Sequence, residues 1–119
     1  MTKESIERRA DRVLAGCIPC TEDGKHVLMI TSRTDPDLLV FPKGGVKVHE
    51  SLEEGAVRET FEEAGVRGVV RDGPISISEI EWFEMVVTEE FSDWPEKLQR
   101  ERIWVPNVIN KCRALWKSY

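Results

Sequence analysis

The sequence predicts an α+β fold in which a mixed β-sheet carries one helix on each side. Short apolar runs separated by turn residues, one well-capped helix and an amphipathic C-terminal segment together indicate this order of elements. The chain has 119 residues, 40% of them hydrophobic and 33% charged, as is typical of a globular domain. A chain of this length suits one core. We therefore expect a single domain over residues 1–119, with residues 1–11 as a flexible N-terminal arm.

Several short strands are expected from apolar runs that are bounded by turn or breaker residues. The first two runs flank the Asp23-Gly24 turn signal and predict a β-hairpin. Pro42 is expected to end the third strand, and the Asp72-Gly73-Pro74 segment is expected to break the fourth. The predicted strands are residues 13–18, 26–32, 38–41, 66–70, 82–87 and 103–105.

The central helix has start and stop signals. Ser51 is a suitable N-cap residue, and Glu54 three positions later completes a capping box. The helix should run to Ala64 and end at Gly65, the usual residue at a helix C-terminus. A second, amphipathic helix is expected over residues 106–117 because its apolar side chains recur at helical spacing.

Composition excludes several classes of function. The net charge of −5 argues against general nucleic-acid binding, which needs a basic excess. No apolar run approaches the length of a membrane span, and no signal peptide follows the charged N-terminus. We therefore expect a cytoplasmic or nuclear protein, or one found in both places, that binds no membrane and is monomeric.

Three cysteines, two of them spaced as Cys17-x-x-Cys20, leave two interpretations open. The spacing occurs in zinc and redox sites. No second such pair is present, however, and the two histidines have no ligand spacing. The favoured interpretation is that Cys17 is a small apolar side chain buried on a strand and that Cys20 lies near its end.

Carboxylates are concentrated on one face of the central helix. Glu59, Glu62 and Glu63 stand at i, i+3 and i+4 and so share a face, and the favourably spaced Glu54–Arg58 pair is expected to occupy the arginine. Val57, Phe61 and Ala64 fall on the opposite face and should pack on the sheet. Clustered carboxylates suit Mg²⁺ or Mn²⁺, which prefer all-oxygen ligands. A solvated acidic surface is the alternative, and the helix alone does not decide between them.

The residues around this helix favour the metal site. Gly44 is followed by five residues and Glu50, then by seven residues and Arg58-Glu59, and Glu62-Glu63 precede Gly65. This pattern resembles the Nudix box, G-x5-E-x7-R-E-U-x-E-E-x-G-U, where U is an apolar residue. Every fixed position matches, and only Thr60 stands where an aliphatic residue is usual. The match is far more specific than a lone glycine motif.

The resemblance implies a fold and roles for individual residues. The fold would be the Nudix α/β/α sandwich, with the catalytic helix on one side of the sheet and the C-terminal helix on the other. Glu59, Glu63 and the backbone carbonyl of Lys43 would bind Mg²⁺ or Mn²⁺, and Glu62 would be the catalytic base. Glu50, Arg58 and Gly65 would hold the motif together.

Other segments resemble the diphosphoinositol polyphosphate phosphohydrolases, particularly their fungal forms, some of which also hydrolyse diadenosine polyphosphates. The similarity covers residues 8–104 and includes 12–17, 28–32, 40–46, 83–85 and 93–96. It implies a small, highly phosphorylated substrate and cleavage of a phosphoanhydride bond. The positions expected to contact substrate are Arg12, Ser32, Arg33, Lys43, Gly44, Gly45 and Arg100. The segment between Gly65 and Trp94 is shorter than in that group and carries acidic residues.

Two other functions remain as alternatives. One is a nucleotide-sugar or dinucleotide pyrophosphatase, which the same helix could serve. The other is a non-catalytic module that binds polyphosphate. The three glutamates argue against this second alternative, because a module that only binds has no need of them.

Overall fold

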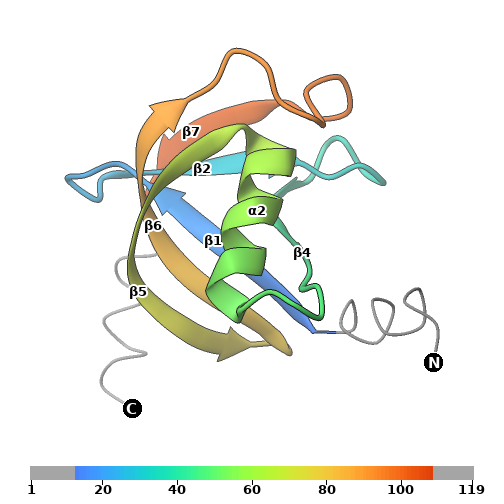
Figure 1. The fold of residues 1–119 in the computed structure, drawn as a ribbon. Coiled ribbons are helices and arrows are strands. Elements are labelled where there is room, and N and C mark those ends of the chain that lie inside the picture. Colours follow the sequence, from blue (N-terminus) through green and yellow to red (C-terminus); the bar gives the residue numbers. More distant parts are fainter. Residues whose placement is uncertain (1–12, 109–119) are drawn as a thin grey trace.

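A computed structural model describes residues 13–108 of the chain, and within this range the strands form one mixed sheet with a single helix against it (Figure 1). The strand order is β3-β2-β1-β6-β5, with β4 paired to β1 and β7 paired to β2. In chain order the elements are β1 (Leu14–Cys20), β2 (His26–Thr31), β3 (Leu39–Val40), β4 (Lys43–Gly45), α2 (Leu52–Ala64), β5 (Val66–Ile77), β6 (Ile80–Glu90) and β7 (Arg102–Pro106).

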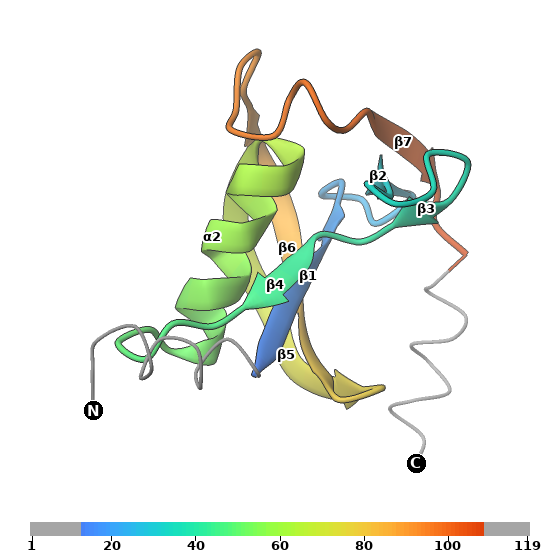
Figure 2. The ribbon, with the colours of Figure 1, turned by 90° about the vertical axis from the view of Figure 1, so that its right-hand side faces the viewer.

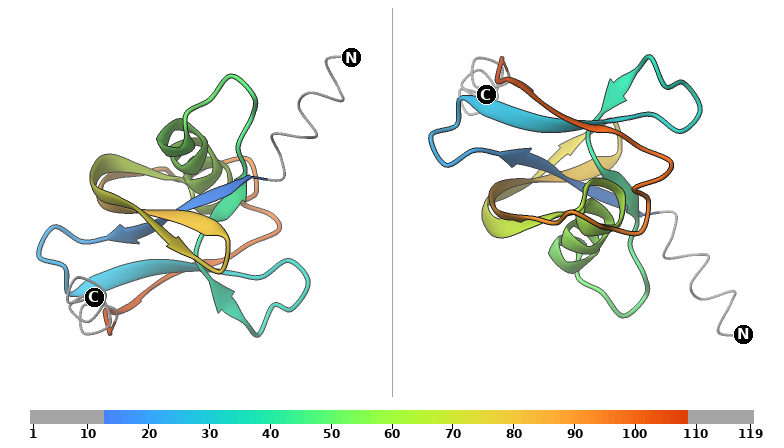
Figure 3. Two further views of the ribbon diagram at one scale, coloured as in Figure 1. Left: turned by 90° about the horizontal axis from the view of Figure 1, so that it is seen from below. Right: turned by 90° about the horizontal axis from the view of Figure 1, so that it is seen from above.

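The sheet is mixed because β1 pairs in parallel with β6 and antiparallel with β2 and β4. The predicted β1–β2 hairpin is confirmed, with Cys20 opposite Val27. Both views of Figure 3 place α2 on the other side of β1 from β2 and β3. The α+β fold class is therefore confirmed for the sheet and for the helix that packs on it.

Helix α2 begins and ends where the sequence predicts. The Ser51 hydroxyl accepts from the backbone N–H of Glu54 at 3.1 Å, and the Glu54 carboxylate accepts from the N–H of Ser51 at 2.9 Å. This capping box satisfies two backbone donors that the first turn leaves open. Gly65 closes the other end in the left-handed conformation, with its N–H donating to the carbonyl of Phe61.

The buried face of α2 differs slightly from the predicted one. Ala56, Thr60 and Ala64 are completely buried, whereas Val57 and Phe61 are only partly buried. The small side chains let the helix approach the sheet closely, so the contact centres on them and not on the larger residues beside them. Thr60 satisfies its buried hydroxyl by donating to the carbonyl of Ala56 at 2.8 Å.

Strand β5 corrects another expectation. The Asp72-Gly73-Pro74 segment was expected to break the strand, but β5 continues to Ile77 and pairs with β6 over its whole length. Register shifts between Val70 and Ile75 accommodate the proline, which cannot donate to a regular ladder. The chain reverses instead at Ser78 and Glu79, which both have positive φ.

Strand β4 also differs from the expectation, because the sequence predicts no strand over Lys43–Gly45, after the breaker Pro42. The segment instead pairs antiparallel with β1, with Gly44 opposite Ala15 and Gly45 opposite Leu14. The close approach requires glycine on the facing strand as well. A Cβ on Gly16 would lie 2.3 Å from the carbonyl oxygen of Pro42.

Other predictions fall outside the described residues. These are the N-terminal arm over residues 1–11 and most of the second helix, which was predicted over 106–117. The boundary of the single domain therefore stays a prediction. The structure describes no helix long and apolar enough to cross a membrane.

Gly65→Ala is expected to destabilise the protein. The residue has φ 66°, and an added Cβ would meet the ring of Trp94 at 2.5 Å. Left-handed backbone alone costs a non-glycine residue about 1 to 3 kcal/mol, and the contact with Trp94 adds to that. Urea unfolding of the variant measures the loss.

Gly24→Ala provides the control, because Gly24 has φ 74° in the turn before β2. The Gly65 variant should lose more stability than this control. Equal losses in the free energy of unfolding would show that the Trp94 ring moves aside without loss of stability.

Candidate active site

The carboxylate of Glu59 lies directly against the backbone of β4. A Cβ on Gly44 would fall 2.3 Å from the carboxyl carbon of Glu59, so only glycine leaves room for the acid there. Helix α2 supplies the carboxylate, and the pairing of β4 with β1 holds the backbone opposite it. The Gly44-to-Glu59 spacing in the sequence thus corresponds to a direct contact between the strand and the helix.

Glu63 is the most buried of the three predicted carboxylates, with 6% of its surface exposed. The backbone N–H of Lys43 donates to its Oε1 at 3.4 Å. Burial, followed by a hydrogen bond with Glu59, raises the pKa of Glu63 to about 8, although the nearby charge of Arg100 opposes the shift. Glu59 and Glu63 therefore lie side by side, in hydrogen-bonding contact.

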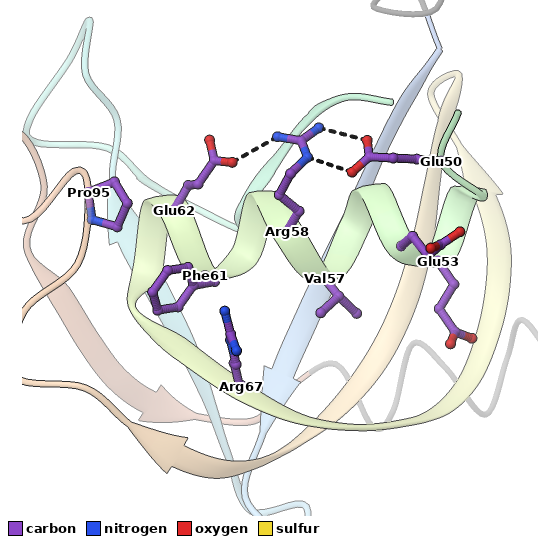
Figure 4. Close-up of a pocket in the computed structure, with 9 residues that line it drawn as sticks. Glu50, Glu53, Val57, Arg58, Phe61, Glu62, Arg67 and Pro95 are labelled. Carbon is purple, nitrogen blue, oxygen red and sulfur yellow. Dashed lines mark hydrogen bonds and ion pairs between the residues drawn. The ribbon is translucent and has the colours of Figure 1, made fainter. Parts of the chain in front are cut away.

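Glu62, the third carboxylate, is bound by Arg58, as the dashed line in Figure 4 marks. The Arg58 guanidinium donates to Glu62 and Glu59 at 2.9 Å each, to Glu50 at 2.7 and 3.0 Å, and to the carbonyl of Gly45 at 2.8 Å. The hydrogen bond from Arg58 also holds the pKa of Glu50 below its usual value. One side chain thus connects the loop before α2, strand β4 and two of the predicted catalytic acids.

The predicted pairing of Arg58 with Glu54 is wrong. The Glu54 carboxylate caps Ser51 instead, while Arg58 reaches Glu50. Sequence spacing along a helix cannot account for a loop residue that folds back over the first turn. Glu50 offers a nearly buried, two-oxygen partner, which is a better match for a guanidinium than an exposed carboxylate.

The residues present fit a divalent cation. Among residues 13–108, no group of three or more His, Cys, Asp or Glu side chains is arranged to hold a metal. Two carboxylates, Glu59 and Glu63, do face each other, and burial with mutual repulsion makes their joint ionisation costly. Mg²⁺ commonly uses one or two protein carboxylates and takes its other ligands from substrate phosphates and water.

A basic pocket of about 220 Å³ lies beside Glu63. The predicted substrate contacts Ser32, Arg33, Lys43 and Arg100 all line it, together with Thr34, Val40, Phe41 and Glu63. Gly44 and Gly45 do not line it. Arg12 lies outside the described residues. The structure therefore brings together four predicted contacts from separate segments of the chain.

Arg100 connects this pocket to the carboxylates. Its guanidinium lies 3.4 Å from Glu63, donates to Glu96 at 2.9 Å, and donates to the carbonyl of Thr31 at 3.0 Å. Glu96 also faces Arg33 at 3.9 Å. Thr31 and Glu96 lie in segments of resemblance, but the sequence pattern assigned neither of them a role. The contact of Thr31 with Arg100 joins distant parts of the chain.

A larger hollow of about 800 Å³ lies along the outer face of α2 and reaches Glu62 and Arg58 (Figure 4). Its apolar lining residues are Val57, Phe61 and Pro95, and Arg67 is a second basic one beside Arg58. Phe61 was expected to pack on the sheet, but it meets Phe91 edge-on at 5.4 Å and lies under Arg67 at 4.5 Å. Four glutamates line the hollow, which makes it less suitable for phosphate than the basic pocket.

Cys17 is buried on β1 and Cys20 is buried at the end of that strand, as the favoured interpretation predicts for Cys17 and for the place of Cys20. Positions three apart on a strand point to opposite faces of the sheet, so the two thiols do not converge. Burial raises the pKa of Cys17 to about 11. This arrangement suits neither a zinc site nor a redox pair.

Comparison with known proteins places the chain in a family. A model of the NUDIX domain matches residues 10–106. Nudix hydrolase 12, mitochondrial, of Arabidopsis thaliana is 36% identical over 88% of this chain and 68% of its own length. Nudix hydrolase 16, mitochondrial, of the same plant is also 36% identical, over 88% of this chain and 74% of its own length.

The chain belongs to the NUDIX domain family. A NUDIX hydrolase from Nitrosomonas europaea shares the fold with a TM-score of 0.62 at 16% identity, covering 85% of this chain and 74% of that one. The chain is thus a Nudix pyrophosphohydrolase, and enzymes of this family act on small phosphorylated substrates and generally use divalent ions such as Mg²⁺.

Gly44→Ala is expected to weaken metal binding by about tenfold or more, the usual cost of disturbing a group that orients a ligand. The added methyl displaces the Glu59 carboxylate but removes no charge. Titration of the protein with Mn²⁺, followed by electron paramagnetic resonance, measures the loss. Glu59→Gln, which removes the charge without a steric change, should show a comparable loss. Binding of wild-type strength in Gly44→Ala would contradict the proposed role of Glu59.

The buried thiols are expected to resist modification in the folded protein. With the pKa of Cys17 at about 11, the thiol stays protonated at pH 8 and ionises only well above it. A chromogenic disulfide reagent at pH 8, applied to a Cys112→Ser background, should therefore titrate no thiol until denaturant is added. Rapid reaction of Cys17 or Cys20 in the native state would reopen the redox interpretation.

Proposed function

We propose that this enzyme hydrolyses a phosphoanhydride bond in diphosphoinositol polyphosphates, in diadenosine polyphosphates, or in both. The observation that carries the proposal is the basic pocket, in which Arg33, Lys43 and Arg100 gather beside Glu63. Guanidinium groups suit phosphate oxygens because they donate in a planar fork. The pocket is small, so it fits a phosphate group and not a nucleoside.

The chemistry divides among the residues of α2 and β4. Glu59, Glu63 and the carbonyl of Lys43 would hold Mg²⁺, whose charge polarises the phosphoryl group and makes water a stronger acid. Glu62 accepts the proton of the attacking water. Arg58 orients the Glu62 carboxylate through the bond at 2.9 Å. Arg100 and Lys43 bind the phosphate oxygens and stabilise the negative charge of the leaving group.

The shortened segment between Gly65 and Trp94 does not argue against a highly charged substrate. Two of its acids, Glu79 and Glu81, lie at or next to the Ser78–Glu79 turn of the β5–β6 hairpin. Figures 1 and 2 place that turn at the opposite end of α2 from the loop that carries Arg100. Neither of these acids lines the basic pocket.

We further propose that the protein acts as a monomer in the cytoplasm, the nucleus or both, as the sequence predicts. Several relatives carry the words mitochondrial or chloroplastic in their names, which describe those plant proteins. Fractionation of cells that express the full chain tests the location, and light scattering of the purified protein tests the oligomeric state.

The decisive experiment is a substrate panel with Mg²⁺. Wild-type protein is incubated with a diphosphoinositol pentakisphosphate, a diadenosine polyphosphate and ADP-ribose, with phosphate release and nucleotide chromatography as readouts. We expect turnover of at least one of the first two substrates. Glu62→Gln should slow it by about 10² to 10⁴-fold, the usual contribution of general base catalysis.

Glu53→Gln is the matched control, because Glu53 is an exposed carboxylate in the first turn of the same helix. Its turnover should equal that of wild type. Tight binding without hydrolysis would favour the non-catalytic module, and turnover of ADP-ribose alone would favour the nucleotide-sugar pyrophosphatase. Equal turnover by Glu62→Gln would remove Glu62 from the role of base.

A further inference from the structure

The C-terminal end of α2 depends on a segment that lies far away in the sequence. A helix leaves its last four carbonyls without partners inside the helix, and α2 has no basic residue in its last turn. The Gly65 N–H satisfies the carbonyl of Phe61. The carbonyls of Glu62, Glu63 and Ala64 accept instead from residues 94–102. These residues form the connection between β6 and β7 and the start of β7.

Each of these three contacts is direct. The backbone N–H of Glu96 donates to the carbonyl of Glu62 at 3.0 Å, and the indole N–H of Trp94 donates to that of Glu63 at 3.2 Å. The Arg102 guanidinium donates to the carbonyls of Ala64 and Gly65 at 3.1 Å each. Figure 2 shows this connection passing over the end of α2.

Arg102 and Trp94 also support each other. The guanidinium lies 4.2 Å from the centroid of the Trp94 ring, a cation–π contact. Gly65 also packs against the Trp94 ring, since a Cβ added to Gly65 would come within 2.5 Å of it. The positive charge of Arg102 sits at the negative end of the helix dipole and supplies the charge that the last turn of α2 lacks.

We propose that Arg102 and Trp94 are positioning residues that hold the turn bearing Glu62 and Glu63 in register with Arg100. The same connection carries Arg100, whose guanidinium meets Glu63 at 3.4 Å. Carboxylates on the helix and the phosphate-binding arginine on the loop are thereby joined through the backbone as well as through side chains. This inference rests on the roles proposed above for Glu62 and Glu63.

Three variants test this role. Arg102→Met removes both the charge and the hydrogen-bond donors, whereas Arg102→Lys keeps the charge. Trp94→Phe keeps an aromatic ring but removes the N–H donor. Metal affinity, measured with Mn²⁺ and no substrate, should fall by about tenfold in Arg102→Met, the usual cost of losing a group that orients a ligand. The value of kcat should fall with it, whereas KM should stay within about twofold. Arg102→Lys should recover part of both losses, and Trp94→Phe should show a smaller loss.

Arg67→Gln is the matched control. Arg67 stacks on Phe61 at 4.5 Å at the same end of α2, but it donates no hydrogen bond to the helix carbonyls that residues 94–102 satisfy. A merely structural arginine would lower the melting temperature, as Arg67→Gln is expected to do, without changing Mn²⁺ affinity or kcat.

The outcomes separate the inference from the proposed function. If wild type turns over no substrate of the panel, the proposed function fails, and Mn²⁺ affinity still reports on the positioning. If wild type is active and Arg102→Met matches Arg67→Gln in Mn²⁺ affinity and kcat, the positioning role is overturned. Should Arg102→Met fail to fold, Trp94→Phe decides in its place, because it still places an aromatic ring against Gly65. Mn²⁺ affinity and kcat of wild-type size in Trp94→Phe would then overturn the inference.

Discussion

The site depends first on the guanidinium of Arg58. Its hydrogen bonds join Glu50 in the loop before α2, the carbonyl of Gly45 on β4, and both Glu59 and Glu62 on the helix. Without this cation, the acidic side chains would lie close together uncompensated, and Glu50 would lose its hydrogen-bonded link to the helix. A single partly buried arginine thus offsets repulsion among the acids and fixes the geometry between strand and helix.

Close approach between backbone and carboxylate is the second constraint. Gly44 leaves room for Glu59 where any side chain would collide with it, and the pairing of β4 with β1 keeps that backbone in place. Burial then makes the pair Glu59 and Glu63 hard to ionise together, as the pKa of Glu63 near 8 shows. A bound cation offsets the repulsion between the two buried carboxylates. This is why carboxylates in this arrangement suit a divalent metal.

Both ends of the helix are held, but by different means. The N-terminal end is capped locally by Ser51 and Glu54, while the C-terminal end takes its donors from residues 94–102. Local capping orders the helix, whereas the remote donors connect its last turn to the loop of Arg100. The acidic turn is therefore the point where the sheet, the helix and the phosphate-binding loop meet.

The sequence by itself determined the family, the limits of α2 and the identity of its acids, because capping and motif spacing are local properties of the chain. It could not assign Arg58 to Glu50 instead of Glu54 or carry β5 through Pro74, and it named Ser32, Lys43 and Arg100 as substrate contacts only through the resemblance. Those outcomes depend on which strands pair and on how closely the helix approaches them. Only the tertiary structure decides such contacts, because they join residues whose separation along the chain carries no information about their distance in space.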